Sequence, residues 1–188
     1  MLYSIDDLVK VTKLTVHDDD RGSLYEVLRE DDDSYITFGQ NYVVTSRVGV
    51  VRGFHYHDML TDHFTIVNGS AIFCVWSVPG CRDDDDAYDT TEYISRAMEI
   101  YSDSLPRHLG DFDGVFDLGV PWFKRIIANG NRPVRIDVPP GVAHGWCALE
   151  PNTILLSTGS EMYNRDEPDE YRLPWDLFGT EVWEIENK

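Results

Sequence analysis

Features typical of secreted and membrane proteins are scarce in this sequence. Only 3 of its 188 residues are cysteine, and an odd number without metal-type spacing favours reduced thiols in a cytoplasmic protein. No apolar run approaches the roughly 20 residues that a membrane-spanning helix needs. The N-terminal stretch MLYSIDDLVK lacks the basic segment and apolar run of a secretory signal. We therefore expect a cytoplasmic protein without a membrane partner.

Positive charge is scarce as well. Lysine and arginine total 16 against 34 aspartate and glutamate residues, which gives a formal net charge of −18 at pH 7. Such a charge repels nucleic acid and anionic membranes, so we expect neither as a partner. A polyanionic ligand such as a nucleotide diphosphate would need a local basic pocket. Arginine side chains such as Arg21 and Arg52 suit that purpose, because guanidinium groups fit phosphate oxygens.

The sequence does contain a regular succession of short β runs. They are rich in β-branched and aromatic residues and are separated by turn signals such as VNGSA, ANGNRP and VPPGV. This pattern predicts one all-β domain over residues 1–188, an antiparallel sandwich or barrel of jelly-roll type with a few short helices. The expected strands are 13–16, 22–29, 35–45, 48–56, 62–67, 70–78, 124–128, 135–138, 144–148 and 153–160.

Two segments depart from the β pattern. Residues 90–101 (TTEYISRAMEIY) carry Tyr93, Ala97 and Ile100 at helical spacing, which predicts a short helix. Residues 102–121 are rich in Gly, Pro and Asp with scattered aromatics. We expect this second segment to be an inserted loop or lid.

A pair of histidines stands one residue apart in the stretch GVVRGFHYHDMLTDHFTIVNG, residues 49–69. Because alternate side chains of a strand share a face, His55 and His57 are expected to project to the same side. With Asp62 and His144 their spacing resembles the metal motifs of the cupin superfamily, where Asp62 stands in place of the usual Glu. Three imidazoles and one carboxylate suit a divalent transition metal. The plain alternative is that His57 and Asp62 face solvent or a hydrogen-bond partner.

Several blocks of the chain, in the same order, resemble the dTDP-4-dehydrorhamnose 3,5-epimerase family, whose members are metal-free jelly rolls within the cupin superfamily. The blocks are DDRGSLYE at 19–26, SRVGVVRGFH at 46–55, NGNRPVRIDVPPGVAHGW at 129–146 and the late Trp175-Asp176. The resemblance runs in pieces over most of the chain, and it implies a cupin-type jelly-roll β-barrel and a homodimer.

Site residues follow from this resemblance. It implies that His55 is the general base that removes the proton next to the 4-keto group of the sugar, with Asp176 as its carboxylate partner. The residues that it assigns to substrate binding are Arg21, Glu26, Gln40, Arg52 and His144, with Arg21 and Glu26 reaching the nucleotide across the dimer interface.

Several positions depart from the family pattern. The family lysine that stabilises the enolate aligns with Asp62, which reverses the charge where an oxyanion forms. The catalytic tyrosine aligns with Ser157, and Tyr163 is the nearby phenol that we expect to replace it. The family glutamine after the first histidine is His57 here. The changes that remove the lysine and the glutamine are therefore the ones that complete the metal motif.

We predict an isomerase that acts on a nucleotide-diphospho-sugar, a dTDP-4-keto-6-deoxy sugar, at C3, C5 or both, without a cofactor. Two alternatives stay open. One is a metal-dependent cupin, either a dioxygenase or a metal-assisted isomerase, with a divalent transition metal bound by His55, His57, Asp62 and His144. The other is a non-catalytic module that binds sugar nucleotides.

Overall fold

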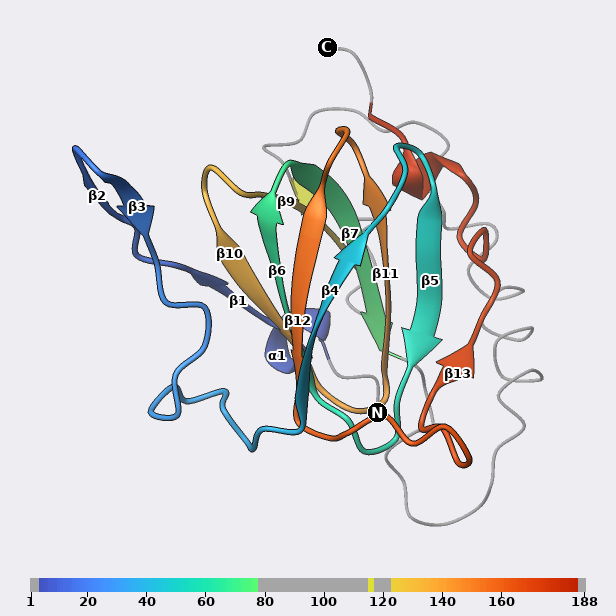
Figure 1. Cartoon of the computed structure of the whole chain (residues 1–188). Helices are drawn as coiled ribbons and strands as arrows, with labels where there is room; N and C mark the ends of the chain where they lie inside the picture. Colours follow the sequence, from blue (N-terminus) through green and yellow to red (C-terminus); the bar gives the residue numbers. More distant parts are fainter. Residues whose placement is uncertain (1–3, 78–114, 117–122, 186–188) are drawn as a thin grey trace.

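Two antiparallel β-sheets pack face to face in the computed structural model, which describes residues 4–77, 115–116 and 123–185 (Figure 1). The five-stranded sheet has the order β1-β10-β6-β12-β4, with strands Lys10–Lys13, Val134–Val138, Asp62–Asn68, Ile154–Gly159 and Gln40–Thr45. The six-stranded sheet has the order β13-β5-β11-β7-β9-β8, with strands Tyr171–Arg172, Val51–Tyr56, Val142–Ala148, Ser70–Ser77, Phe123–Asn129 and Val115–Phe116. This is the predicted all-β, cupin-type jelly roll.

A two-stranded hairpin, β2 (His17–Asp19) and β3 (Gly22–Leu24), extends away from the two sheets (Figure 1). We call residues 17–24 the arm. The helical elements of the described residues are α1 (Ile5–Leu8) and the single 3-10 turn η1 (Glu181–Trp183). Neither is long and apolar enough to cross a bilayer.

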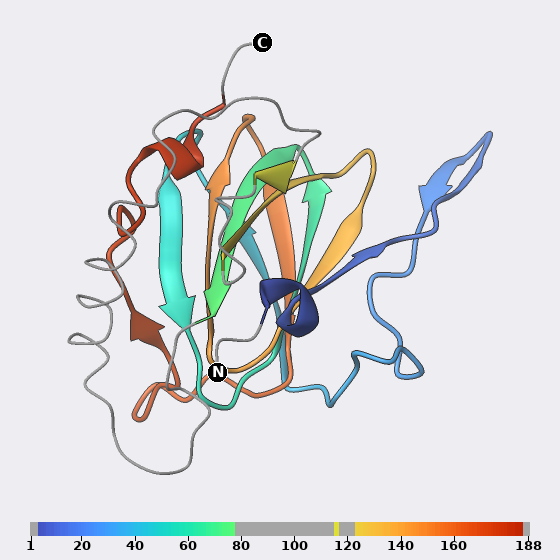
Figure 2. The same cartoon turned by 180° about the vertical axis from the view of Figure 1, so that it is seen from behind.

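The hydrophobic core has two layers. Between the sheets, Phe64 and Ile66 of β6 belong to one buried cluster with Phe73 of β7 and Trp146 of β11. On the outer face of the six-stranded sheet, the C-terminal segment runs beside β5 (Figure 2) and packs Phe178 and Trp183 there. Both faces of the six-stranded sheet are thus covered, which explains the nearly continuous apolar run SAIFCVWS of β7.

Strands β5 and β11 approach each other closely through two glycines. A Cβ atom on Gly53 would lie 2.5 Å from the Cα of Gly145, and Gly53 also has a φ of 140°. Only glycine tolerates both conditions without strain. The close approach lies beside the pair of His55 and His144, which are opposite each other in the same two strands.

The chain between the arm and β4 does not form the predicted strands. The expected strand 22–29 ends at Leu24, and the expected strand 35–45 begins only at Gln40. Side-chain hydrogen bonds hold part of this segment in place of a ladder of backbone bonds. The buried Arg135 guanidinium of β10 donates to the carbonyl of Val27 at 3.0 Å and to the hydroxyl of Ser34 at 2.7 Å.

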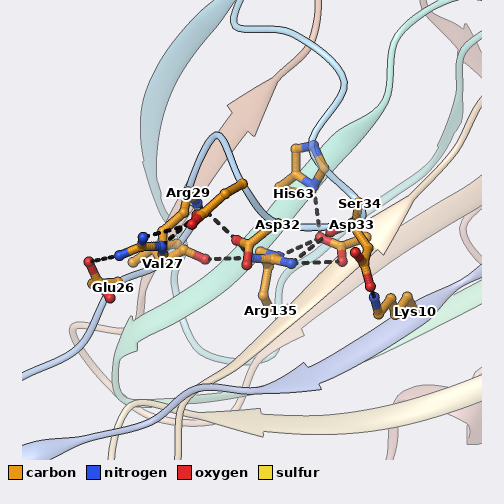
Figure 3. A network of polar contacts seen from close by, with 11 residues as sticks. Lys10, Glu26, Val27, Arg29, Asp32, Asp33, Ser34, His63 and Arg135 are labelled. Atoms are coloured by element: carbon orange, nitrogen blue, oxygen red, sulfur yellow. Dashed lines mark hydrogen bonds and ion pairs between the residues drawn. The ribbon is translucent and has the colours of Figure 1, made fainter.

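Arg135 is the centre of a larger buried network (Figure 3). Its other donors bond to Asp32 at 2.5 Å and to Asp137 at 2.7 and 3.4 Å, so all five N–H groups have an acceptor. Asp137 also contacts His63 Nδ1 at 2.7 Å. The network fastens the segment that follows the arm onto β10 and β6.

Two predicted segments lie outside the described residues. The helix expected over 90–101 is one of them. The inserted loop or lid expected over 102–121 is the other, apart from residues 115–116, which form β8 against β9.

Candidate active site

A cavity of about 560 Å³ opens at the end of the barrel where β4 begins and β5 ends. Its walls come from the start of β4, the loop from β5 to β6, and the chain before β13. The lining includes Gln40, Tyr42, His57, Tyr163, Asp169 and Glu170. The volume lies in the usual range for a pocket that holds a small organic ligand.

Three histidines lie together at this end of the barrel. His55 of β5 is opposite His144 of β11 in the strand register, with ring centroids 6.3 Å apart. The ring of His57 lies 5.4 Å from that of His144, and His144 packs on Phe64 of the inner core. The expectation that His55 and His57 project to one side of the strand agrees with these contacts.

Asp62, the first residue of β6, lies among these histidines and is only 1% exposed. Its Oδ1 accepts hydrogen bonds from Ser157 at 2.9 Å and from Tyr42 at 3.3 Å. Its Oδ2 lies 3.3 Å from His57 Nε2 and 3.7 Å from His144 Nε2. The Asp62 carboxylate therefore contacts side chains from both sheets.

The second nitrogen of each ring has a backbone partner. His57 Nδ1 contacts the carbonyl oxygen of Asp169, and His144 Nδ1 lies 3.3 Å from the carbonyl oxygen of Val142. The Asp169 carboxylate in turn accepts the N–H groups of residues 58, 59 and 60 at 2.8, 2.9 and 3.0 Å. The loop that carries His57 is thus held in place by Asp169.

Burial and charge give the histidines different proton affinities. Burial lowers the pKa of His55, although the charge of Glu170 offsets part of this effect. Burial lowers the pKa of His144 to about 4. Burial also lowers the pKa of His57, but the Asp62 carboxylate outweighs it and the pKa is raised overall. His55 and His144 are therefore neutral near pH 7, which is the form that accepts a proton.

The structure does not bring Asp176 to His55. The C-terminal segment lies on the outer face of β5, where Phe178 packs edge-on against Phe54. His55 points from the other face into the barrel, toward His144. Asp176 is exposed, and no hydrogen bond or ion pair within the described ranges joins it to His55.

Glu170 is a carboxylate near His55 that the sequence analysis did not select. It precedes β13, whose Arg172 is opposite His55 in the register. Its Oε1 accepts a hydrogen bond from Arg172 Nε at 2.7 Å; its charge raises the pKa of His55, whereas the charge of Arg172 lowers it. The family motif gave no signal for Glu170, because only the pairing of β13 with β5 brings it to the site.

The remaining predicted site residues divide into two groups. Gln40 and Tyr163 line the cavity, and the Gln40 side-chain oxygen accepts the backbone N–H of Tyr163 at 3.2 Å. Arg52 instead bonds to the carbonyl of Thr45 at 3.2 Å, at the end of β4 away from the cavity.

Arg21 lies on the arm, and Glu26 follows the arm. The arm extends away from the barrel of its own chain (Figure 1). Arg21 forms an ion pair with Asp19, and Glu26 forms one with Arg29 at 2.8 Å. Neither residue lines the cavity of its own chain.

Of the four residues in the alternative metal set, the structure gathers three. One ligand atom from each of His57, Asp62 and His144 lies within 4.8 Å of the others, and His55 is not part of this group. Tyr42 and Ser157, which the sequence gave no reason to select as partners of Asp62, complete the surroundings of the carboxylate.

The chain resembles known proteins in sequence and in fold. Residues 17–88 match the family model described as polysaccharide biosynthesis C-terminal domain. Over 172 residues the chain is 31% identical to the spore coat polysaccharide biosynthesis protein SpsL of Bacillus subtilis, with 90% of each chain covered. It is 30% identical to the probable low-salt glycan biosynthesis epimerase Agl13 of Haloferax volcanii, with 89% of this chain and 87% of the relative covered.

A solved structure shows the same fold. The dTDP-4-dehydrorhamnose 3,5-epimerase from Sulfolobus tokodaii has a TM-score of 0.63 against this chain at 19% identity. The superposition covers 90% of this chain and 78% of the other.

Proposed function

Since the chain belongs to the dTDP-4-dehydrorhamnose 3,5-epimerase family, we propose that this sugar-nucleotide epimerase inverts C3, C5 or both of a dTDP-4-keto-6-deoxy sugar. The observation that carries the proposal is His55. Its neutral imidazole points into the barrel beside His144, and its ring nitrogens have no hydrogen-bond partner among the described residues. A neutral imidazole without a partner is available to accept a proton.

Proton removal is the first step. A carbon next to a ketone is only weakly acidic, so a base near its proton and a stabilised enolate both lower the barrier. His55 takes this proton and becomes an imidazolium. The nearby charge of Glu170 stabilises that imidazolium, which is the part that the family resemblance assigns to Asp176.

Inversion requires that a proton return on the opposite face of the sugar. Tyr163 lines the cavity, and its side chain is 58% exposed. Its phenol is our candidate for this proton donor. The family tyrosine position is occupied by Ser157, and the Ser157 hydroxyl donates its hydrogen bond to Asp62.

The described residues that line the cavity of one chain include no arginine or lysine that could bind the diphosphate of a nucleotide. The arm, which carries Arg21, extends away from the barrel (Figure 1). We propose that two chains form a homodimer in which the arm, with the adjacent Glu26, reaches the nucleotide in the partner subunit's cavity. An arginine there would supply the positive charge that a diphosphate needs against a net charge of −18.

The test is exchange of solvent deuterium. The protein is incubated with dTDP-4-keto-6-deoxyglucose in D₂O, and the label at C3 and C5 is followed by NMR. We expect incorporation with the wild-type protein and a loss of about 10²–10⁴-fold with His55→Asn. Equal incorporation in the two proteins would contradict the assignment of the base. No incorporation at either carbon in the wild type would instead favour the non-catalytic binding module.

A further inference from the structure

We propose that His57, Asp62 and His144 form a binding site for a divalent first-row transition-metal ion. The ligand atoms are Nε2 of each histidine and Oδ2 of the carboxylate. All three residues belong to the one group of possible metal ligands in the described part of the chain, where the ligand atoms lie within 4.8 Å of one another. Binding of the ion does not depend on the proposed epimerase reaction.

Two of the three separations are close to those of atoms that share one ion. Two ligand atoms that are each about 2.1 Å from a metal lie about 3.0 Å apart at a right angle and about 3.4 Å apart at the tetrahedral angle. Asp62 Oδ2 lies 3.3 Å from His57 Nε2 and 3.7 Å from His144 Nε2. The carboxylate oxygen therefore lies within about 0.3 Å of the tetrahedral separation from each of the two histidine nitrogens.

The carboxylate oxygen lacks any other partner. Asp62 is only 1% exposed, and its Oδ2 is buried without a hydrogen bond. Buried polar atoms are normally paired, so a buried carboxylate oxygen whose described contacts are two imidazoles at 3.3 and 3.7 Å is suited to a bound cation. A proton on His57 would satisfy one of the two contacts, whereas a metal ion engages all three atoms together.

Each of the three residues is also oriented by an outer partner. The backbone carbonyls of Asp169 and Val142 accept from Nδ1 of His57 and of His144. A carbonyl only accepts, so Nδ1 carries a hydrogen, and in the neutral ring the Nε2 lone pair faces the centre. The other oxygen of Asp62 accepts hydrogen bonds from Tyr42 and Ser157. Metal ligands in proteins are typically held in this way.

The chemical types of the three ligand atoms indicate which metal ions the site can bind. Two imidazoles and one carboxylate suit Zn²⁺, Mn²⁺, Fe²⁺, Co²⁺ or Ni²⁺ and leave coordination positions open, whereas Mg²⁺ and Ca²⁺ prefer oxygen ligands. Because His57 lines the cavity, the open positions are expected to face a bound sugar. There the ion would stabilise the enolate oxygen and supply the positive charge that the family lysine supplies at the position of Asp62. This role, unlike binding itself, rests on the proposed function.

The experiment measures binding in the absence of substrate. The full chain is treated with EDTA, freed of chelator and titrated with Co²⁺, followed by visible absorption and by elemental analysis after dialysis. We expect one equivalent per chain in the wild type and in His55→Gln, which keeps all three ligands. His57→Gln and Asp62→Asn should bind at least about 100-fold more weakly, while circular dichroism shows that they remain folded.

Three results would overturn the proposal. One is a wild-type protein that retains no stoichiometric Co²⁺, Zn²⁺ or Mn²⁺, as expected if a His57–Asp62 ion pair occupies the site. Another is unchanged affinity in both ligand variants. The third is loss of the ion in His55→Gln, which would place His55 among the ligands.

The catalytic role has a separate readout. If the ion stabilises the enolate, deuterium exchange into the dTDP-sugar stops in the EDTA-treated protein and returns with added metal. Exchange that is unaffected by metal removal would refute the role and leave the epimerase proposal standing. Metal binding without exchange under any condition would refute the epimerase proposal and leave the metal site standing.

Discussion

Removal of the Arg135 side chain should destabilise the protein far more than removal of an exposed arginine. Figure 3 shows its guanidinium between β10 and the segment that follows the arm. The Arg135 side chain is 3% exposed and that of Asp137 is 6% exposed. In Arg135→Met the Asp137 carboxylate therefore stays buried without its cationic arginine partner, with His63 and Ser34 as remaining side-chain neighbours.

The size of the stability loss depends on which carboxylates can be rehydrated when Arg135 is removed. The Asp32 side chain is 31% exposed, so it can be rehydrated when Arg135 is removed. Asp137 cannot, and a buried ion pair that loses one partner typically costs about 3–5 kcal/mol. In a domain of this size that loss lowers the melting temperature by about 6–20 °C.

Arg29 is the matched control. It also has several carboxylate partners, Glu26 at 2.8 Å and Asp31 at 2.7 Å, but its side chain is 50% exposed. Exposed pairs of this kind contribute about 0–1 kcal/mol each, so Arg29→Met should lose at most about 2 kcal/mol. Urea denaturation followed by tryptophan fluorescence gives both free energies of unfolding. Equal losses for the two variants would refute the reasoning from burial.

Three further predictions concern the site and its support. Glu170→Gln should slow deuterium exchange about tenfold, a loss of roughly 1.4 kcal/mol, and slow it more than Asp176→Asn does; the reverse order would restore the dyad that the family resemblance implies. Tyr163→Phe should keep deuterium exchange but lose the inverted product, detected by NMR of the sugar; loss of exchange would remove the phenol from the return step. Burial raises the pKa of Asp137, but His63 and Arg135 outweigh it and hold it below 3.8. Asp137 thus stabilises the fold above that pH and loses this contribution as the pH falls through the lower folded value, so acid denaturation curves of Asp137→Asn should flatten there.

The sequence predicted the barrel more accurately than the site. Strand periodicity and turn signals placed most of the strands, because the central strands of both sheets bury at least one face and so carry an apolar pattern. They failed between residues 25 and 39, where side-chain bonds to Arg135 replace a ladder of backbone bonds. Such bonds depend on a residue from a distant strand and leave no local pattern.

The same contrast holds for the histidines. The one-residue spacing of His55 and His57 in a strand was enough to predict that both point to one side. The sequence alone left open whether His55 belongs with His57, Asp62 and His144 as a ligand or stands apart as a base. The structure groups Asp62 with His57 and His144, because Asp62 begins a strand of the opposite sheet and reaches these two rings across the barrel.

What the sequence by itself determined is therefore the class of fold, the family and the histidine-bearing strands, since these depend on local periodicity and on short motifs. Only the tertiary structure decided which carboxylate accompanies each histidine. Glu170 reaches the surroundings of His55 through the pairing of β13 with β5, while Asp176 is carried to the outer face by Phe178 and Trp183. The physical reason is that a carboxylate acts over a few ångströms, and those distances are set by how the C-terminal segment buries its aromatic side chains.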